Sequence, residues 1–414
     1  MLPAFTESAI HQASSIMYEV TQDLMNLISK DVAGQGYYTQ INISSYTKDV
    51  ALDMIGRAGF GHDLGTSSKK ATEMNTLFLD ILKMFTTPSL YCFLRFRFSW
   101  ICHLGKHFSA EEIKIRKYQK ENKIYSDTLV KTAEQEMKKG TAEEDRNFLR
   151  FIKRASSNGA SSIITDEELR ESVPLLLLAG LETSATTLSW AIHALTRGAD
   201  GIEKQERLRS ELCASEFQGW QTDFSVLNRM PYLDAVCTEV LRLHPAFGII
   251  SRVCWQDTVI PLSEPVILRD GTTTNKITIK KGEHLHISTL SINRCTSTWG
   301  ENANEFIPER WLRDDHIYFD PNLSSSNNSS LGGWNHHLSF GQGTRMCLGF
   351  RFALAEIKII LAYCIANFDW KQAIDPKTGK PFEIEQRGQK IIFASIKGAK
   401  EDDFSLPVLV REIK

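Results

Sequence analysis

Residues Phe340–Gly349 read FGQGTRMCLG, and this stretch decides how the rest of the sequence is interpreted. A single cysteine, Cys347, lies in it, directly before an apolar segment that predicts a helix over 349–367. A helix N-terminus and exposed backbone N–H groups stabilise negative charge on sulfur, so the stretch predicts a Cys347 thiol with a lowered pKa. Gly343 and Gly349 allow the backbone to turn tightly and to approach a flat ligand. The stretch therefore predicts a thiolate site on a tight loop.

The residues around Cys347 indicate which kind of ligand this loop binds. Arg345 lies two residues before Cys347 and offers a cation for a ligand carboxylate. A lone cysteine without a second metal-type neighbour indicates a single axial bond to iron already held in a cofactor, as in haem thiolates. His336 and His337 precede the loop as rival ligands, but Cys347 fits the ligand role, so we expect the two histidines in a surface loop.

The overall composition is that of a globular protein with no electrostatic bias. The 414 residues include 48 Lys and Arg against 50 Asp and Glu, which argues against nucleic acid as a partner because phosphate binding needs a basic surplus. Hydrophobic residues make up 42%, which excludes disorder as a whole-chain description. The eight cysteines form no C-x-x-C pair, so we expect reduced thiols rather than a zinc ribbon or a disulfide framework.

Hydrophobic periodicity predicts a mainly α chain with a small β-rich portion, an α+β class, organised as one domain over 1–414. Thr165 and Glu168 have the spacing of a capping box, which predicts the start of a helix at this point. Short runs rich in Val, Ile and Thr predict strands within 247–290 and in the C-terminal tail, and Ser324–Ser330 predicts a loop. The helices are predicted over 6–30, 44–60, 69–86, 110–139, 165–197, 200–214, 231–243 and 349–367.

Two apolar stretches could be mistaken for membrane spans. Glu182 and several hydroxyl residues interrupt 172–195, so a buried central helix is favoured there. The stretch 77–104 is rich in aromatic residues, and it predicts either a buried loop or an apolar lip, within 85–104, that contacts a membrane surface.

At this point the sequence resembles the cytochrome P-450 family, and it is most similar to fungal members. The spacing F-x-x-G-x-R-x-C-x-G from Phe340 to Gly349 is the haem-binding signature of that family. Three further motifs follow the family order: A-G-x-(D/E)-T at Ala179–Thr183, E-x-x-R at Glu239–Arg242, and P-E-R-W at Pro308–Trp311, where the family has P-E-R-F. The resemblance implies the cytochrome P-450 fold and haem b with Cys347 as axial thiolate, held also by the loop residues Phe340, Gly343, Arg345 and Gly349.

The motif at Ala179–Thr183 predicts that residues for oxygen binding and proton transfer lie on one helix. Ala179, Gly180 and Thr183 share a helix face, and Gly180 would let a flat cofactor or O2 approach. Thr183 and Glu182 form an alcohol–acid pair that can relay protons to iron-bound oxygen. The alternative is an ordinary threonine bonded back to a carbonyl of its own helix.

Four charged residues complete the predicted site. Glu239 and Arg242 are spaced i, i+3 on an apolar helix, so a buried pair there needs a third partner. The resemblance supplies Arg310 as that partner and assigns the three residues to support of the haem loop. It also implies that Arg252 holds a haem propionate.

The resemblance implies a haem-thiolate monooxygenase that inserts one oxygen atom of O2 into a hydrophobic small molecule, in secondary metabolism or xenobiotic oxidation. Its electrons would come from a separate NADPH-dependent reductase, and family members are expected at the endoplasmic reticulum membrane. The chain lacks the anchor, the first strands and the W-x-x-x-R helix of the family, so the sequence predicts an N-terminally shortened member that is peripheral or cytoplasmic. A haem-deficient remnant and a haem-thiolate isomerase or dehydratase remain open alternatives.

Overall fold

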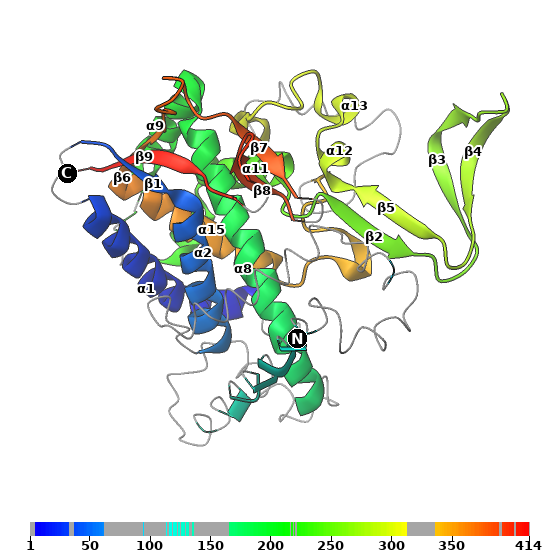
Figure 1. Ribbon diagram of the computed structural model, residues 1–414, viewed down its shortest axis with the longest axis horizontal. Helices are drawn as coiled ribbons and strands as arrows, with labels where there is room; N and C mark the ends of the chain where they lie inside the picture. The colour runs from blue at the N-terminus through cyan, green and yellow to red at the C-terminus, as the bar shows by residue number, and fades with distance from the viewer. Residues whose placement is uncertain are drawn as a thin grey trace.

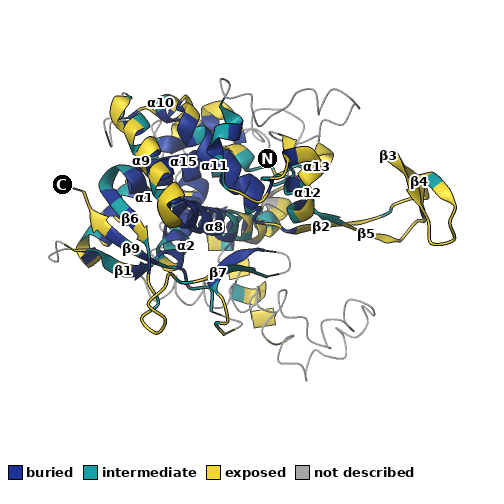
Figure 2. Ribbon diagram, turned by 90° about the horizontal axis from the view of Figure 1, so that it is seen from above, coloured by how far each residue is buried: buried dark blue, intermediate teal, exposed yellow. Residues whose placement is uncertain are grey.

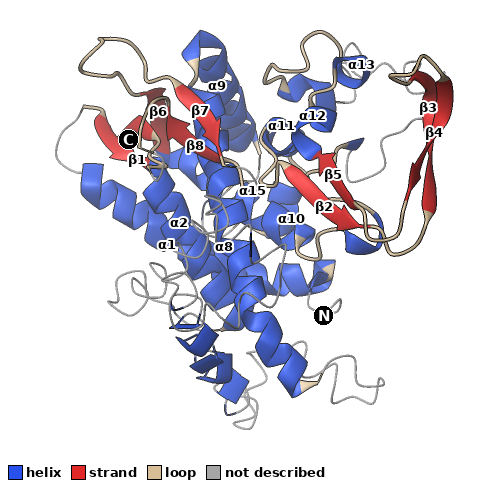
Figure 3. Cartoon of the chain, turned by 45° about the vertical axis from the view of Figure 1, so that its right-hand side comes forward, coloured by secondary structure: helices blue, strands red, loops and turns tan. Residues whose placement is uncertain are grey.

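The computed structural model describes residues 5–32, 37–61, 165–215, 217, 219, 222–312, 336–388, 391–400 and 403–413, with single positions and short runs between 94 and 135. Helices form one mass, and the strands lie at its periphery (Figures 1 and 3). This arrangement confirms the mainly α class with a small β portion. The helical elements are α1 (Glu7–Val32), α2 (Ile43–Met54), the π-helix η2 (Ile55–Gly59), α8 (Asp166–Thr196), α9 (Gly198–Ala214), α10 (Phe224–Asn228), α11 (Pro231–Leu243), α12 (Thr289–Asn293), α13 (Thr296–Trp299), the 3-10 helices η5 (Pro308–Trp311) and η7 (Gly343–Arg345), and α15 (Phe350–Asn367).

The strands form small antiparallel sheets. The three-stranded sheet has the order β1-β9-β6, and it pairs Ile41 near one end of the chain with Val408 near the other. The remaining strands form the two-stranded pairs β2–β5, β3–β4 and β7–β8. The bounds are β1 (Thr39–Asn42), β2 (Ile249–Val253), β3 (Thr258–Ile267), β4 (Thr273–Ile279), β5 (His284–Ser288), β6 (Phe368–Gln372), β7 (Ile384–Arg387), β8 (Phe393–Ile396) and β9 (Pro407–Glu412).

The core is built around α15, in which twelve of eighteen residues are buried. A helix with so many apolar, buried residues is stable only inside a protein, and α1, α8, α9, α10 and α11 pack around it. Figure 2 shows this buried centre and, in contrast, the exposed β3–β4 hairpin that projects from it. The hairpin carries large exposed apolar side chains, among them Ile267 at 77%.

The predicted capping box at the start of α8 is confirmed. The Thr165 hydroxyl accepts from the Glu168 backbone N–H at 3.2 Å, and the Glu168 carboxylate accepts from the Thr165 N–H at 2.7 Å. Arg170–Thr196 is long and apolar enough to cross a membrane by length and composition, yet 67% of its most apolar window is buried inside the protein. This burial is the one expected for a central helix.

Several predictions fall on other parts of the chain. The helix over 69–86, the loop Ser324–Ser330, and Cys92 and Cys102 lie outside the described residues, as does all but one residue of 85–104. The positions described between 113 and 135 are helical, within the range predicted for 110–139. The six described cysteines are free thiols.

Candidate functional site

The Cys347 loop is a tight turn that leads into the buried helix α15. Gly341 and Gly343 adopt φ values of 68° and 70°, which residues with a Cβ rarely adopt. The Cys347 N–H donates to the Phe340 carbonyl at 2.7 Å, and the Met346 N–H donates to the Gly343 carbonyl at 3.1 Å. These bonds close the loop on itself and leave Cys347 exposed.

The electrostatics of the Cys347 thiol differ from the sequence prediction. Although the residue is partly open to solvent, the protein packed around it raises the pKa of its thiol, and the Gly349 backbone N–H lowers that pKa by less. The expected lowered pKa is therefore wrong for the protein alone. In the protein alone, a single directed N–H does not outweigh the loss of hydration at the sulfur.

Other loop residues lie around the cysteine in different settings. The Phe340 ring packs against that of Phe350, with 6.0 Å between the ring centroids. A Cβ added to Gly343 would meet nothing within 4 Å, whereas a Cβ at Gly349 would lie 3.6 Å from the Phe5 ring. Gly343 thus faces open space, and Gly349 is covered by the segment that precedes α1.

Two cationic side chains lie near this loop. Arg345 is exposed and has no hydrogen-bond or ion-pair partner among the described residues. Arg252 on β2 is exposed too, and it donates only to the Ser251 carbonyl, at 3.0 Å. Ile250 lies on the same face of β2 as Arg252, and its Cδ1 lies 3.9 Å from the Cβ position of Gly341. The strand therefore places Arg252 beside the loop.

Helix α8 contributes an open surface at Ala179 and Thr183. Ala179 is exposed, Thr183 is half-buried, and the two lie one turn apart. The Thr183 hydroxyl donates to the Ala179 carbonyl at 2.5 Å. Its hydrogen is therefore engaged, and its oxygen lone pairs are left to accept a hydrogen bond from a group on the open side.

Glu182 does not form a direct pair with Thr183. Its side chain is fully buried, and neither carboxylate oxygen has a hydrogen-bond partner among the residues that the structure covers. Burial raises the pKa of this carboxyl, and the positive charge of Lys48 on α2 opposes that shift. Consecutive helix residues point about 100° apart, so Glu182 faces a different side of α8 from Thr183.

Gly180 has a packing role that the sequence does not reveal. A Cβ at this position would lie 2.9 Å from both Cγ1 and Cδ1 of Ile55, the first residue of η2. The expectation that Gly180 leaves room for a cofactor or O2 is therefore corrected, because the Ile55 side chain fills that space. The missing side chain allows α8 to approach η2 closely.

The structure brings Glu239, Arg242 and Arg310 together in the interior. The Glu239 carboxylate accepts from Nε and Nη2 of Arg242, both at 2.8 Å, and from Nε of Arg310 at 3.2 Å. It also accepts from the indole Nε1 of Trp311 at 3.0 Å. The sequence did not predict this last contact. The signal that could have revealed it is Trp311 itself, because the family has phenylalanine at this position and only tryptophan carries an indole N–H. We call these four residues the Glu239 cluster.

The Glu239 cluster connects to the Cys347 loop through backbone groups. Arg242 Nη1 donates to the Asn293 carbonyl at 2.8 Å. The Asn293 side chain then donates to the Ser339 hydroxyl at 2.9 Å and accepts from the Leu338 N–H at 2.9 Å. Ser339 immediately precedes Phe340, so the buried charges fix the segment that enters the loop.

His337 differs from the surface loop expected for it. Its side chain is buried against the Trp311 ring, at a centroid distance of 6.0 Å. Burial and the positive charges of Arg242 and His336 lower its pKa to about 3, so it is neutral. His336 is exposed, as expected for a loop, and has a φ of 60°.

The sequence of this chain is similar to those of known proteins. A family model described as Cytochrome P450 matches residues 1–393. Cytochrome P450 monooxygenase claW from Ampulloclitocybe clavipes is 31% identical over 428 residues, which cover 100% of this chain and 74% of the relative. Its companion claP is 30% identical with the same coverage, and a ganoderic acid synthetase from Ganoderma lucidum is 27% identical over 90% of this chain and 70% of its own length.

Proposed function

Because the chain belongs to the cytochrome P450 family, we propose that it is a haem-thiolate monooxygenase in which Cys347 is the axial ligand of the iron. The observation that carries this proposal is the exposed Cys347 on its closed loop, within a chain that the family matches over residues 1–393. The reaction inserts one atom of O2 into a hydrophobic small molecule. Its electrons come from a separate NADPH-dependent reductase.

The residues near the loop fit haem b, the cofactor that the family implies. The group needs one thiolate and two cations for its propionates, and Cys347, Arg345 and Arg252 offer these. Neither arginine is committed to a carboxylate of the described chain. The open space at Gly343 leaves room for a planar group over the loop. An iron bound at this sulfur would supply the positive charge that favours the thiolate.

The bound haem supplies the oxygen activation, and the protein supplies orientation and proton control. Cys347 would hold the haem through its thiolate, which would supply electron density to the iron. Ala179 presents only a methyl group to the open side of α8 and leaves room for a substrate. Thr183 accepts a hydrogen bond at its oxygen while the Ala179 carbonyl holds its proton, so it orients a proton donor on that side.

Glu182 is the proposed proton reserve behind this hydroxyl. Because burial raises its pKa, the carboxyl keeps its proton to a higher pH than an exposed glutamic acid does. It makes no direct hydrogen bond to Thr183, so transfer between the two requires an intervening water molecule or a side-chain rotation. Glu182 is thus a buried proton donor near Thr183, and the two side chains do not form a hydrogen-bonded pair.

The relatives guide the choice of substrate class and location. They are named as fungal cytochrome P450 monooxygenases and as a ganoderic acid synthetase. We therefore expect a hydrophobic secondary metabolite as substrate. Family members are membrane-associated, and we propose that this chain works at the endoplasmic reticulum surface.

The test is the spectrum of the reduced protein with carbon monoxide. The chain should bind haem and show the Soret shift of a thiolate-ligated iron, and Cys347→Ser should lose that shift. Cys213→Ser removes an exposed free thiol from α9 and is the matched control. A thiolate-type spectrum that survives Cys347→Ser would overturn the assignment. Product formation without O2 or NADPH would favour the isomerase or dehydratase alternative.

A further inference from the structure

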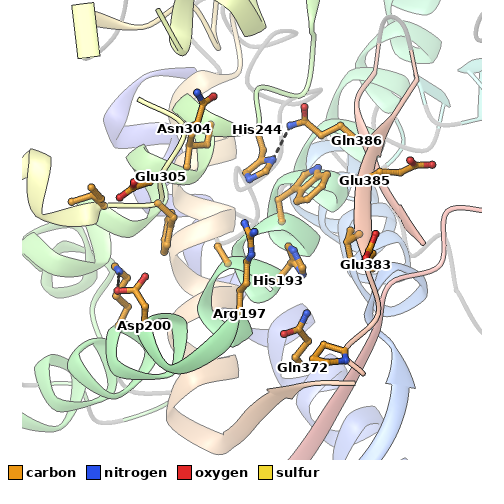
Figure 4. Close-up of a pocket in the computed structure, with 18 of the residues that line it drawn as sticks. His193, Arg197, Asp200, His244, Asn304, Glu305, Gln372, Glu383, Glu385 and Gln386 are labelled. Carbon is orange, nitrogen blue, oxygen red and sulfur yellow. Dashed lines mark hydrogen bonds and ion pairs between the residues drawn. The ribbon is translucent and has the colours of Figure 1, made fainter. Parts of the chain in front are cut away.

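A cavity of about 1440 Å³ lies at the C-terminal end of α8. It is lined by the last turns of α8, one face of α9, the end of α11 and the segment containing β7 (Figure 4). Arg197 follows Thr183 by fourteen residues, which is about 20 Å along a helix. The residues assigned to haem do not line this cavity.

Most of the basic residues in this cavity are already paired. Lys204 is bonded to Asp200, Arg207 to Glu309 at 2.9 Å, and Lys397 to Glu383 at 2.7 Å. Two cations remain without a carboxylate. Arg294 donates to the Leu243 carbonyl, which is neutral, and Arg197 has no side-chain partner among the described residues.

The unpaired Arg197 points into the cavity. Figure 4 shows its side chain rising from the start of α9 toward His244, with Asn304 on one side of that histidine and Gln386 of β7 on the other. Glu383 and Glu385 lie on the far side of the cavity from Arg197, and the Glu385 carboxylate points away from it. Guanidinium groups bind carboxylates and phosphates in a bidentate manner, so Arg197 offers a preformed half of such a contact.

Positively charged side chains act on two buried histidines that line the cavity. His193 and His244 are both held neutral: burial lowers the pKa of each, and Arg197 lowers both further. Arg294 and Arg242 act on His244 in the same direction. No carboxylate is among the groups that shift these two histidines, although Glu203 and Glu305 also line the cavity.

The neutral His244 adds a hydrogen-bond donor. Its Nδ1 lies 2.9 Å from the Gln386 amide nitrogen, which can only donate, so Nδ1 accepts and the ring proton is on Nε2. The ring is also stacked on Trp190, with 4.0 Å between centroids and 10° between planes. The donor is therefore held in one orientation.

We propose that this cavity binds a small molecule through an oxyanion group, a carboxylate or a phosphate, which pairs with Arg197 and Arg294. His244 supplies the neutral donor, and Asn304 provides an adaptable polar contact at the wall. The site is separate from the haem site and serves a ligand other than the oxidised substrate.

The experiment is calorimetric titration of the full, haem-loaded chain with inorganic phosphate and, separately, with benzoate at constant ionic strength. We expect saturable binding of at least one probe, and the two arms distinguish a phosphate ligand from a carboxylate ligand. Arg197→Ala should weaken that binding about tenfold or more, because a charged hydrogen-bonding partner is lost. Arg207→Ala removes an arginine of the same cavity that is already paired with Glu309, and it should leave the affinity within about twofold.

Arg197→Gln keeps a long polar side chain and serves if the alanine variant does not fold. Absence of saturable binding of both probes, or equal affinity in the wild type and the Arg197 variant, would overturn the proposal. The titration measures binding and not turnover, so a failure to bind the probes says nothing about the monooxygenase assignment. A failure of the monooxygenase assignment likewise says nothing about binding in this cavity.

Discussion

Replacing Glu239 with alanine removes the carboxylate that pairs with two buried arginines, Arg242 and Arg310. Glu239 and Arg242 are fully buried, and the Arg310 side chain is 2% exposed. Removing one partner of a buried ion pair costs about 3–5 kcal/mol because an uncompensated charge is left inside the protein. Two guanidinium groups depend on this carboxylate, so we expect a loss near the upper end, about 5 kcal/mol. A protein stable by about 5–15 kcal/mol would lose much of its margin.

The Glu239→Ala substitution should also loosen the Cys347 loop. Arg242 uses all five of its N–H donors: two to Glu239, and three to the backbone carbonyls of Asn293, Ala303 and Glu305. A shifted Arg242 therefore releases the segment that enters the loop. We expect the Glu239→Ala variant to retain less haem than the wild type as well as to unfold earlier.

The assay is urea unfolding followed by far-UV circular dichroism, with haem retention measured on the same samples. Glu383→Ala is the matched control, because it removes a carboxylate that is also bonded to a basic residue, Lys397, but on the surface. Its unfolding midpoint should equal that of the wild type, since exposed ion pairs contribute little. The reasoning fails if Glu239→Ala unfolds at the same urea concentration as Glu383→Ala.

Three further predictions concern α8 and α15. Thr183→Ala should uncouple NADPH consumption from product formation, whereas Thr183→Ser should keep the two coupled. Thr187→Ala, one helical turn later, is the control and should leave the coupling unchanged. Equal coupling in the wild type and all three variants would refute the role of Thr183. Gly180→Ala should lower the free energy of unfolding by about 1–3 kcal/mol, because the added methyl group clashes with Ile55. In the double variant Gly180→Ala/Ile55→Ala the loss should be smaller than the sum of the two single losses. Unfolding midpoints of the three variants measure this difference. Burial raises the pKa of Glu356 to about 8, so the native protein holds a proton that the unfolded chain releases near pH 4.5, and stability should fall as pH rises between these values. Glu356→Gln should flatten that slope in unfolding experiments run from pH 5 to pH 8, and parallel slopes would contradict the assignment.

The sequence predicts those parts of the fold that depend on local pattern. The capping box at Thr165, the helix that ends at Leu243 and the helix after Gly349 follow from periodicity and from short motifs. Each of these features is determined within one helix. The Cys347 loop is predictable for the same reason, since its glycines and cysteine lie within ten residues.

The details that the sequence does not predict all depend on distant neighbours. Gly180 faces Ile55, which is 125 residues earlier in the chain, and nothing near Gly180 indicates that contact. The isolation of Glu182 depends on the packing of α2 against α8, and the burial of His337 depends on Trp311. The direction of the Cys347 pKa shift likewise depends on the balance between packing and one N–H group.

The pairing of β1 with β9 has a consequence for synthesis of the chain on the ribosome. Ile41 pairs with Val408, which is made 367 residues later. At the usual 5–20 residues per second, β1 waits roughly 20–70 s for its partner. During that interval the apolar face of α1 lacks α15 as well, so we expect chaperones to bind the nascent chain there. Chains stalled before residue 407 should stay chaperone-bound, whereas completed chains should be released.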